Sequence, residues 1–305
     1  MKYLLILCLL VFPATVAASK KKEKAAAPSS AARTEEDEAT KAAAEFEAGL
    51  KYERGKIVLP GGMATLNVPD NFRYLSPEQT DRIIVDAWGN PPGTKTLGML
   101  FPSDVSPLSP EGWGVVITFE EDGYVEDDEA GKINYDELLT QMKEATAERN
   151  KEREQQGFEP VNLVGWATRP RYDQATRKLY WAKELNFAGA PVNTLNYDIR
   201  VLGRRGVLSF NAVASMDQLG AIEQNMKEVL GFAEFNPGHR YADFSSGTDK
   251  VAAYGIGALI AGKVAAKVGL FKLALGFILA GKKFLFLGLL AVAAFVKKLF
   301  GRKSE

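Results

Sequence analysis

The pattern of hydrophobic and polar residues along this chain is mixed, and its short β-rich runs predict several strands. Two β-rich runs, 57–59 and 64–68, flank a Pro-Gly-Gly sequence and predict a hairpin. The turns between consecutive strands are too short for helical crossovers, so we expect an antiparallel sheet and the α+β class. The pattern leaves open whether the strands form one sheet or two similar halves, about 56–157 and 158–248. Further strands are expected at 97–101, 113–119, 163–168, 178–185, 194–202 and 206–214.

Two or three helices are expected to pack on the sheet, and the start of each is marked in the sequence. In the first, Ser76 and Gln79 match a capping box. In the last, Ser215 and Gln218 form the same motif before an apolar face at helical spacing. A modest helix is also expected near 39–50. The apolar face of the last helix consists of Leu219, Ile222, Met226 and Val229.

The sequence GYVEDDEAGKINYDELLTQM, residues 123–142, gathers acidic side chains and raises three possibilities. A calcium loop counted from Thr118 is disfavoured because its first position is Thr and a strand-like run, rather than a helix, precedes it. Paired catalytic carboxylates need one desolvated and one ionised acid, and this exposed-looking run offers no such asymmetry. The favoured interpretation is a solvated charged turn before a helix capped by Asn134, with Asp136 and Glu137 in the first helical turn.

The N-terminal residues have the pattern of an export signal. A positive residue precedes a short apolar run, and Val16 and Ala18 fit a signal-peptidase site, so residues 1–18 are predicted to be removed. The single cysteine, Cys8, lies inside this run, which leaves the mature chain without disulfides or thiolate chemistry. Residues 19–41 are rich in Lys, Ala, Ser and Glu and predict a flexible charged lead-in.

Residues 251–300 form a hydrophobic tail that is interrupted by lysines. Its longest stretch without lysine, 284–296, has 13 residues, whereas a membrane-crossing helix needs about 20. One interpretation is a single crossing or a hairpin; the other is basic amphipathic helices that lie on an anionic leaflet. In both cases we expect a helical membrane anchor, followed by a basic end at 301–305. The lysines expected to contact lipid or a partner are Lys263, Lys267, Lys272, Lys282 and Lys283.

Charge divides the chain at the same boundary. Residues 25–250 contain 24 basic and 36 acidic residues, whereas residues 251–305 contain nine basic residues and one acidic residue. The net charge of the whole chain is zero because the charge of an acidic body, residues 42–248, is offset by that of the basic tail and of the basic N-terminal residues. An acidic exported body argues against nucleic acid as a partner, because binding to phosphates depends on basic patches.

Other motifs predict no cofactor, no metal and no catalytic residue. GALIAGKV, residues 257–264, matches the start of a phosphate loop but ends in Val where Ser or Thr would bind magnesium. One histidine, His239, cannot form a His cluster, and we expect it to pack in the connection before the tail. The aromatic residues of the strands and turns are expected in the core rather than in a ligand platform. They are Trp113, Trp166, Trp181, Tyr172 and Tyr180.

A family resemblance rests on three stretches: WGVVITFEEDGYVEDDEAGKINYDELLTQM, GWATRPRYDQATRKLYWAKEL, and LSFNAVASMDQL with a glycine-rich hydrophobic tail after it. They resemble the bacterial membrane-anchored proteins grouped as domain of unknown function 2167. The resemblance covers most of residues 40–300 and implies a signal peptide, an extracytoplasmic domain and a C-terminal membrane anchor. It implies no activity, so it assigns no catalytic residue.

These patterns favour a non-enzymatic accessory or scaffold protein in the inner membrane, with its acidic α+β body in the periplasm. It would act through contacts with a membrane-protein partner or with further copies of itself, and with membrane lipids. Two alternatives come from other classes: a periplasmic hydrolase that uses carboxylates, and a cationic membrane-perturbing or pore-forming protein.

Overall fold

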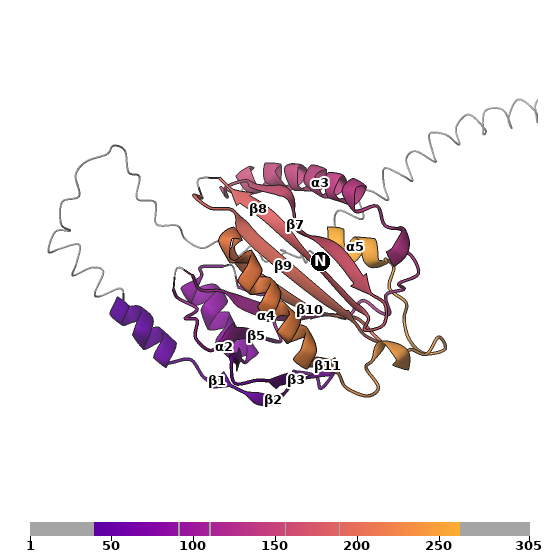
Figure 1. Cartoon of the computed structure of the whole chain (residues 1–305), viewed down its shortest axis with the longest axis horizontal. Coiled ribbons are helices and arrows are strands. Elements are labelled where there is room, and N and C mark those ends of the chain that lie inside the picture. Colours follow the sequence, from indigo (N-terminus) through magenta and orange to yellow (C-terminus); the bar gives the residue numbers. More distant parts are fainter. Residues whose placement is uncertain (1–39, 91, 110, 156, 189, 263–305) are drawn as a thin grey trace, which may run out of the picture.

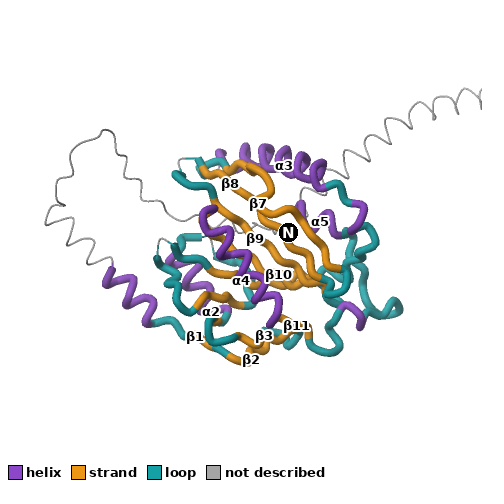
Figure 2. The backbone as a smooth tube through the Cα atoms, viewed as in Figure 1, coloured by secondary structure: helices purple, strands orange, loops and turns teal. Residues whose placement is uncertain are grey.

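Two sheets and the helices packed on them make up the described part of the chain. The computed structural model describes residues 40–262 except 91, 110, 156 and 189. The predicted signal peptide, most of the lead-in and the five tail lysines therefore lie outside the described residues. The large sheet has the strand order β1-β4-β5-β6-β10-β9-β8-β7, and the small sheet has the order β11-β3-β2 (Figure 1, Figure 2).

Every pairing within the large sheet is antiparallel, which confirms the predicted α+β class. Strand β6 pairs with β10, so strands from both parts of the sequence join in one sheet. The strands are β1 (Tyr52–Glu53), β2 (Gly55–Val58), β3 (Ala64–Val68), β4 (Phe72–Leu75), β5 (Gly98–Pro102), β6 (Gly114–Glu120), β7 (Val161–Asp173), β8 (Lys178–Phe187), β9 (Thr194–Leu202), β10 (Val207–Ser215) and β11 (Ala233–Phe235). The helices are α2 (Pro77–Asp81), η1 (Arg82–Ala87), η2 (Ala130–Lys132), α3 (Tyr135–Gln155), η3 (Met216–Gln218), α4 (Leu219–Phe232), η4 (Tyr241–Asp243) and α5 (Ile256–Ala261).

Helix α4 and the small sheet cover one face of the large sheet, and α4 crosses this face in Figure 1. Ile222, Met226 and Val229 of α4 are completely buried and pack in one cluster with residues of β6, β9 and β10. This confirms the predicted apolar face. Gln218 Oε1 accepts a hydrogen bond from the Ser215 amide at 3.0 Å, which is one half of the predicted capping box.

The opposite face carries two apolar clusters. Helices α3 and α5 cover β7, β8 and part of β9, where Met142 and Ile256 are buried. Helices α2 and η1, together with a helix at residues 40–48, cover β4, β5 and β6, where Ile83 and Ile84 are buried. Residues alternate between the two faces along a strand, so the middle of β9 and β10 presents a polar strip between these clusters.

The first predicted helix forms and starts after Ser76 as expected, but its capping and its later hydrogen bonding differ from the prediction. Ser76 makes no side-chain capping bond, and Gln79 Oε1 instead accepts a hydrogen bond from Arg82 Nη1 at 3.3 Å. From Arg82 onward the helix is a π-helix, in which the Trp88 amide donates to Ile83 O at 2.9 Å. The wider turn brings Ile83 and Trp88, five residues apart, toward the same face, where both are buried.

The described start of the tail packs against the body. Ile256, Leu259 and Ile260 of α5 are buried in the cluster that α3 also covers. Between residues 40 and 262, leaving aside the four gaps, no helix has the length and hydrophobicity of a membrane span. The expected anchor continues beyond Gly262, outside the described residues, and stays a prediction.

Two glycine substitutions should have opposite effects on stability. At Gly98 the backbone φ is +122°, and a Cβ would lie 2.3 Å from the Tyr74 ring. Backbone strain and overpacking should therefore each cost Gly98→Ala about 1–3 kcal/mol. Gly231 lies in α4 with nothing within 4 Å of such a Cβ, so Gly231→Ala should stabilise the helix by up to about 1 kcal/mol.

Urea unfolding of the full-length chain, followed by fluorescence of the buried tryptophans, measures both effects. Equal unfolding midpoints for the two variants would contradict the close packing of Tyr74 over Gly98.

Candidate functional site

Hydrogen bonds join an acidic loop, residues 121–129 between β6 and η2, to a connecting segment, residues 236–262 after β11. Three carboxylates of the acidic loop each accept a hydrogen bond from the connecting segment. The acidic loop therefore binds the part of the chain that leads into the hydrophobic tail. The donors and acceptors are Tyr254 Oη to Asp122 Oδ2 (2.7 Å), Tyr241 Oη to Asp127 Oδ1 (3.0 Å) and the Gly257 amide to Glu129 Oε1 (3.1 Å).

Asp127 is largely buried, with a side chain that is 9% exposed. It also accepts a hydrogen bond from Tyr172 Oη at 2.6 Å and forms an ion pair with Arg177. Burial by itself raises the pKa of the carboxyl, but the tyrosine hydroxyls and the Arg177 guanidinium outweigh burial and lower the pKa of Asp127. Arg177 lies in the β7–β8 turn, so Asp127 joins this hairpin to the connecting segment.

The backbone of the acidic loop also pairs with the connecting segment. The Tyr124 amide donates to Lys250 O at 2.8 Å, and the Ala252 amide donates to Tyr124 O at 2.8 Å, which makes a parallel bridge to Val251. Gly123 allows this close approach, because its φ is +114° and a Cβ there would lie 2.6 Å from Lys250 O. A glycine is therefore required where the two segments meet.

Arg204 in the β9–β10 turn binds Asp249, the last acidic residue before the tail. Arg204 Nε and Nη2 donate to the two oxygens of Asp249 at 2.6 and 3.1 Å, and the Ser245 amide donates to Oδ2 at 2.8 Å. The Asp249 side chain is 0% exposed, covered by these groups rather than by the core. The Arg204 guanidinium first, and then the Ser245 amide, outweigh desolvation and lower the pKa of Asp249 to about 2.

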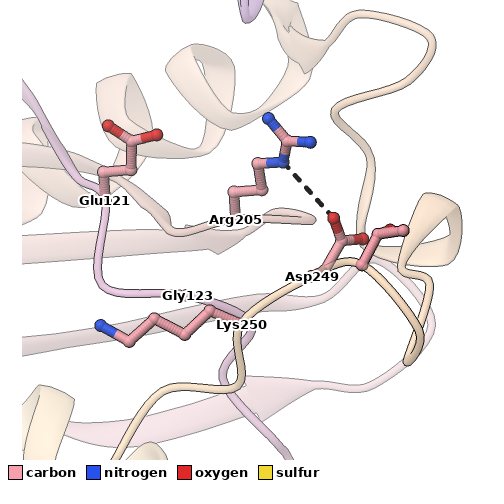
Figure 3. Close-up of a pocket in the computed structure, with 6 residues that line it drawn as sticks. Glu121, Gly123, Arg205, Asp249 and Lys250 are labelled. Atoms are coloured by element: carbon pink, nitrogen blue, oxygen red, sulfur yellow. Dashed lines mark ion pairs between the residues drawn. The ribbon is translucent and has the colours of Figure 1, made fainter.

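A shallow pocket of about 290 Å³ lies where the acidic loop, the β9–β10 turn and the connecting segment meet (Figure 3). Arg205 Nε lies 3.5 Å from Asp249 Oδ1, which is an ion pair rather than a good hydrogen bond, and its side chain is 57% exposed. The volume is at the lower end for ligand sites, so the pocket suits a small group. The lining residues are Glu121, Gly123, Arg205, Thr248, Asp249 and Lys250.

The acidic residues of the sequence 123–142 thus fall into two groups with different partners. Asp136 and Glu137 begin α3, and Asn134 Oδ1 accepts hydrogen bonds from their amides at 3.2 and 3.3 Å, which confirms the predicted charged start of a helix. The expectation of a solvated turn is wrong for Asp127, because its donors compensate for its burial. Within the described ranges, no three His, Cys, Asp or Glu side chains gather as possible metal ligands.

A second polar cluster, which the sequence pattern did not predict, occupies the strip between the two apolar clusters. Asp198 of β9 pairs with Lys183 Nζ at 3.2 Å and with Arg200 Nη2 at 3.1 Å, and all three residues are buried. Burial raises the pKa of Asp198, but the two cations and a hydrogen bond from Asn211 Nδ2 at 2.9 Å outweigh burial and lower the pKa. The sequence signal that could have predicted this cluster is the presence of charged residues at alternate positions of an otherwise apolar strand, such as Asp198 and Arg200 of β9. We interpret this cluster as structural.

The other candidate residues occupy structural positions. Trp113 and Trp181 are buried in the core, as expected, whereas the Tyr172 hydroxyl binds Asp127. His239 lies in the connecting segment, where its carbonyl accepts a hydrogen bond from the Arg204 amide at 2.9 Å. Residues 257–261 of the motif that resembles a phosphate loop lie in α5, and residues 263–264 lie outside the described residues. The contacts of the five tail lysines stay predictions.

Comparison with known proteins places the chain beside one family and two solved folds. The family model described as "Protein of unknown function (DUF2167)" matches residues 51–293. The solution structure of cyanobacterial PsbP (CyanoP) from Synechocystis sp. PCC 6803 is 8% identical, covers 61% of this chain and 92% of its own, and has a TM-score of 0.34. The crystal structure of the Saccharomyces cerevisiae Ran-binding protein Mog1p is 11% identical, covers 65% and 100%, and has a TM-score of 0.32.

No curated protein sequence matches this chain. Because both TM-scores are low, the two structures indicate nothing about its activity.

Gly123→Ala should release the connecting segment from the acidic loop. The added Cβ would clash with Lys250 O and the positive φ would be strained, so the local contacts should lose about 1–3 kcal/mol. Hydrogen exchange of the Tyr124 and Ala252 amides should then become about tenfold faster or more. Gly131→Ala in η2 is the matched control, because nothing lies within 4 Å of a Cβ there. Equal exchange in both variants would contradict the proposed role of Gly123.

The Arg204–Asp249 ion pair should make the free energy of unfolding depend on pH in the acidic range. The pKa of Asp249 is about 2 in the folded chain and about 3.9 in an unfolded chain. The stabilisation that ionised Asp249 gives the folded state is therefore complete above about pH 4 and is lost as the pH falls toward 2. Asp249→Asn should therefore be less stable than the wild type at neutral pH, and the difference should narrow below about pH 4. Urea midpoints measured across this range test the expectation, and a constant difference would count against it.

Proposed function

We propose that this chain, which belongs to the DUF2167 family of proteins of unknown function, is a non-enzymatic accessory protein that acts through protein–protein contacts at a membrane. The observation that carries the proposal is the network of hydrogen bonds between the body and the residues that lead into the hydrophobic tail. Side chains and backbone of the acidic loop bind the connecting segment along much of its length. A body connected in this way keeps one orientation relative to whatever anchors the tail.

The magnitudes support a connection that depends on polar contacts. Burying Ile256, Leu259 and Ile260 contributes about 1.5–3 kcal/mol for each side chain. Fixing the backbone of the six residues of α5 costs about 1–2 kcal/mol for each residue. These two terms nearly cancel, so the carboxylate hydrogen bonds and the Arg204–Asp249 pair decide whether the segment stays on the body.

A fixed orientation favours a protein that presents one surface to a neighbour. Flexible attachment would lower the effective concentration of such a surface at its partner, and ordering it on binding would cost affinity. An enzyme that collects a freely diffusing substrate has no comparable need for fixed orientation. This contrast is why we favour the accessory role over a carboxylate-dependent hydrolase.

We further propose that the body lies on the periplasmic side of the inner membrane. The N-terminal export pattern and the basic end at 301–305 support this orientation, because positive residues favour the cytoplasmic flank of a membrane segment. The five tail lysines would then pair with lipid phosphates or with acidic side chains of the partner, since an unpaired charge within a bilayer is costly.

Insertion of a flexible Gly-Ser segment after Gly262 should separate anchoring from partner binding. The tagged full-length chain is purified from its own membranes, and co-purifying proteins are compared with those of an equal insertion after Val192, an exposed residue in the β8–β9 turn. Both insertions should resist extraction by carbonate, but only the insertion after Gly262 should lose the partner, by about tenfold or more.

If the partner is recovered equally with both insertions, the proposed role of the fixed connection is wrong. Release of the wild-type chain by carbonate would overturn the proposed membrane anchoring.

A further inference from the structure

The helix at residues 40–48 contacts the body through two neighbouring side chains. Figure 1 shows this helix, coloured indigo, at one edge of the body. Phe46 packs against the apolar cluster of α2 and η1, with the Arg82 guanidinium carbon 5.0 Å from its ring centre. Glu47 lies beside it and binds the body through its carboxylate. None of residues 40–48 is buried and most are exposed, so the helix depends on these two side chains for its position.

Arg73 of β4 and Ser106 of the β5–β6 loop bind the two carboxylate oxygens of Glu47. Arg73 Nη2 donates to Oε1 at 3.0 Å, and the Ser106 hydroxyl donates to Oε2 at 2.5 Å. The Arg73 side chain is 14% exposed, and among the described residues it has no other ion pair within 4.0 Å. Two donors on two oxygens fix the orientation of a carboxylate as well as its charge.

The body holds these donors in place without the helix. The Arg73 guanidinium carbon lies 3.9 Å from the centre of the Tyr52 ring, and Nη2 also donates to Val105 O at 2.8 Å. The Ser106 hydroxyl accepts a hydrogen bond from the Leu108 amide at 3.2 Å. Arg73 Nε is buried and has no hydrogen-bond partner within the described ranges, so the site keeps a further donor for an acceptor.

The site cannot be vacated without cost. If Glu47 left, Arg73 would remain largely buried with no carboxylate to pair with, which is unfavourable. Release of the helix is therefore favoured when another carboxylate takes the place of Glu47. Since the helix buries little of its own surface, a segment that brings a carboxylate together with more apolar surface would compete with it effectively.

We propose that Arg73 and Ser106 form a recognition site for an acidic side chain of a partner protein, and that Glu47 occupies this site within the same chain until the partner displaces it. The partner segment would carry an aromatic residue beside the acidic one, because Phe46 and Glu47 bind as neighbours. The helix then acts as an internal competitor that lowers the apparent affinity for such segments. Only the source of the carboxylate, a partner protein, rests on the proposed accessory role.

The test uses the full-length protein in a non-ionic detergent and a fluorescein-labelled peptide of residues 40–51, with binding followed by fluorescence anisotropy. Glu47→Gln removes the internal carboxylate, so this variant should bind the peptide about tenfold more tightly than the wild type does. The matched control is Glu45→Gln, in the same helix, whose side chain is 71% exposed and which should leave the affinity unchanged.

Two further changes test the carboxylate site itself. A peptide that carries Glu47→Gln should bind the Glu47→Gln protein about tenfold more weakly than the unchanged peptide does, because it lacks the charged acceptor. Adding Arg73→Gln to the Glu47→Gln protein should weaken binding of the unchanged peptide by a similar factor.

Equal affinity of the wild type and the Glu47→Gln protein for the peptide, no binding to the Glu47→Gln protein, or equal binding of the two peptides would overturn the proposal. Thermal unfolding of each variant shows whether the fold is intact, and the comparison of the two peptides needs no change at Arg73. The measurement requires neither a membrane nor the natural partner, so its failure is distinguishable from failure of the accessory role.

Discussion

The hydrogen bonds between carboxylates of the acidic loop and the connecting segment are the interaction on which the rest of this structure depends. Residues that lead into the tail donate one hydrogen bond to each of three carboxylates, those of Asp122, Asp127 and Glu129. Hydrogen bonds to charged groups contribute about 1.5–3 kcal/mol each where water is excluded, and less where they are exposed. Because apolar burial of the short helix α5 only balances the entropy of ordering it, these bonds determine where the body ends and the tail begins.

The acidity of the body therefore has a local structural meaning. A run of acids often does no more than keep a surface solvated, but here Asp127 is enclosed by two tyrosines and an arginine that stabilise its charge. Arg204 of the β9–β10 turn does the same for Asp249. The boundary between the acidic and basic parts of the chain is thus a place where charges are paired and oriented.

The cluster around Asp198 and the hydrogen-bond network of the acidic loop connect different parts of the protein. The cluster around Asp198 lies inside the sheet, where its charges pair with one another across neighbouring strands. The network of the acidic loop instead links segments that are far apart in sequence, and it leaves Arg205 and Lys250 exposed at its edge. A fixed body is suited to present one surface to a neighbour, which is what the proposed accessory role requires.

The sequence by itself determined the features that depend on near neighbours in the chain. The start of α3 at Asn134 and the apolar face of α4 follow from side chains only a few residues apart, and both are present in the structure. The antiparallel sheet followed from short turns for the same reason. The expected capping box at Ser76 did not form, since Gln79 accepts a hydrogen bond from Arg82 instead. The π-helix, in which the Trp88 amide donates to Ile83 O, was not predicted either.

Only the tertiary structure decided which acids are solvated and which are bound. Asp127 and Glu126 look alike in the sequence, yet the partners of Asp127 are contributed by positions 45 to 114 residues away. The pairing of β6 with β10, which unites the sheet, depends in the same way on strands distant in sequence. The local sequence pattern does not predict contacts between residues that are distant in the chain. Such contacts stabilise the protein only after folding has brought the groups together and excluded water from them.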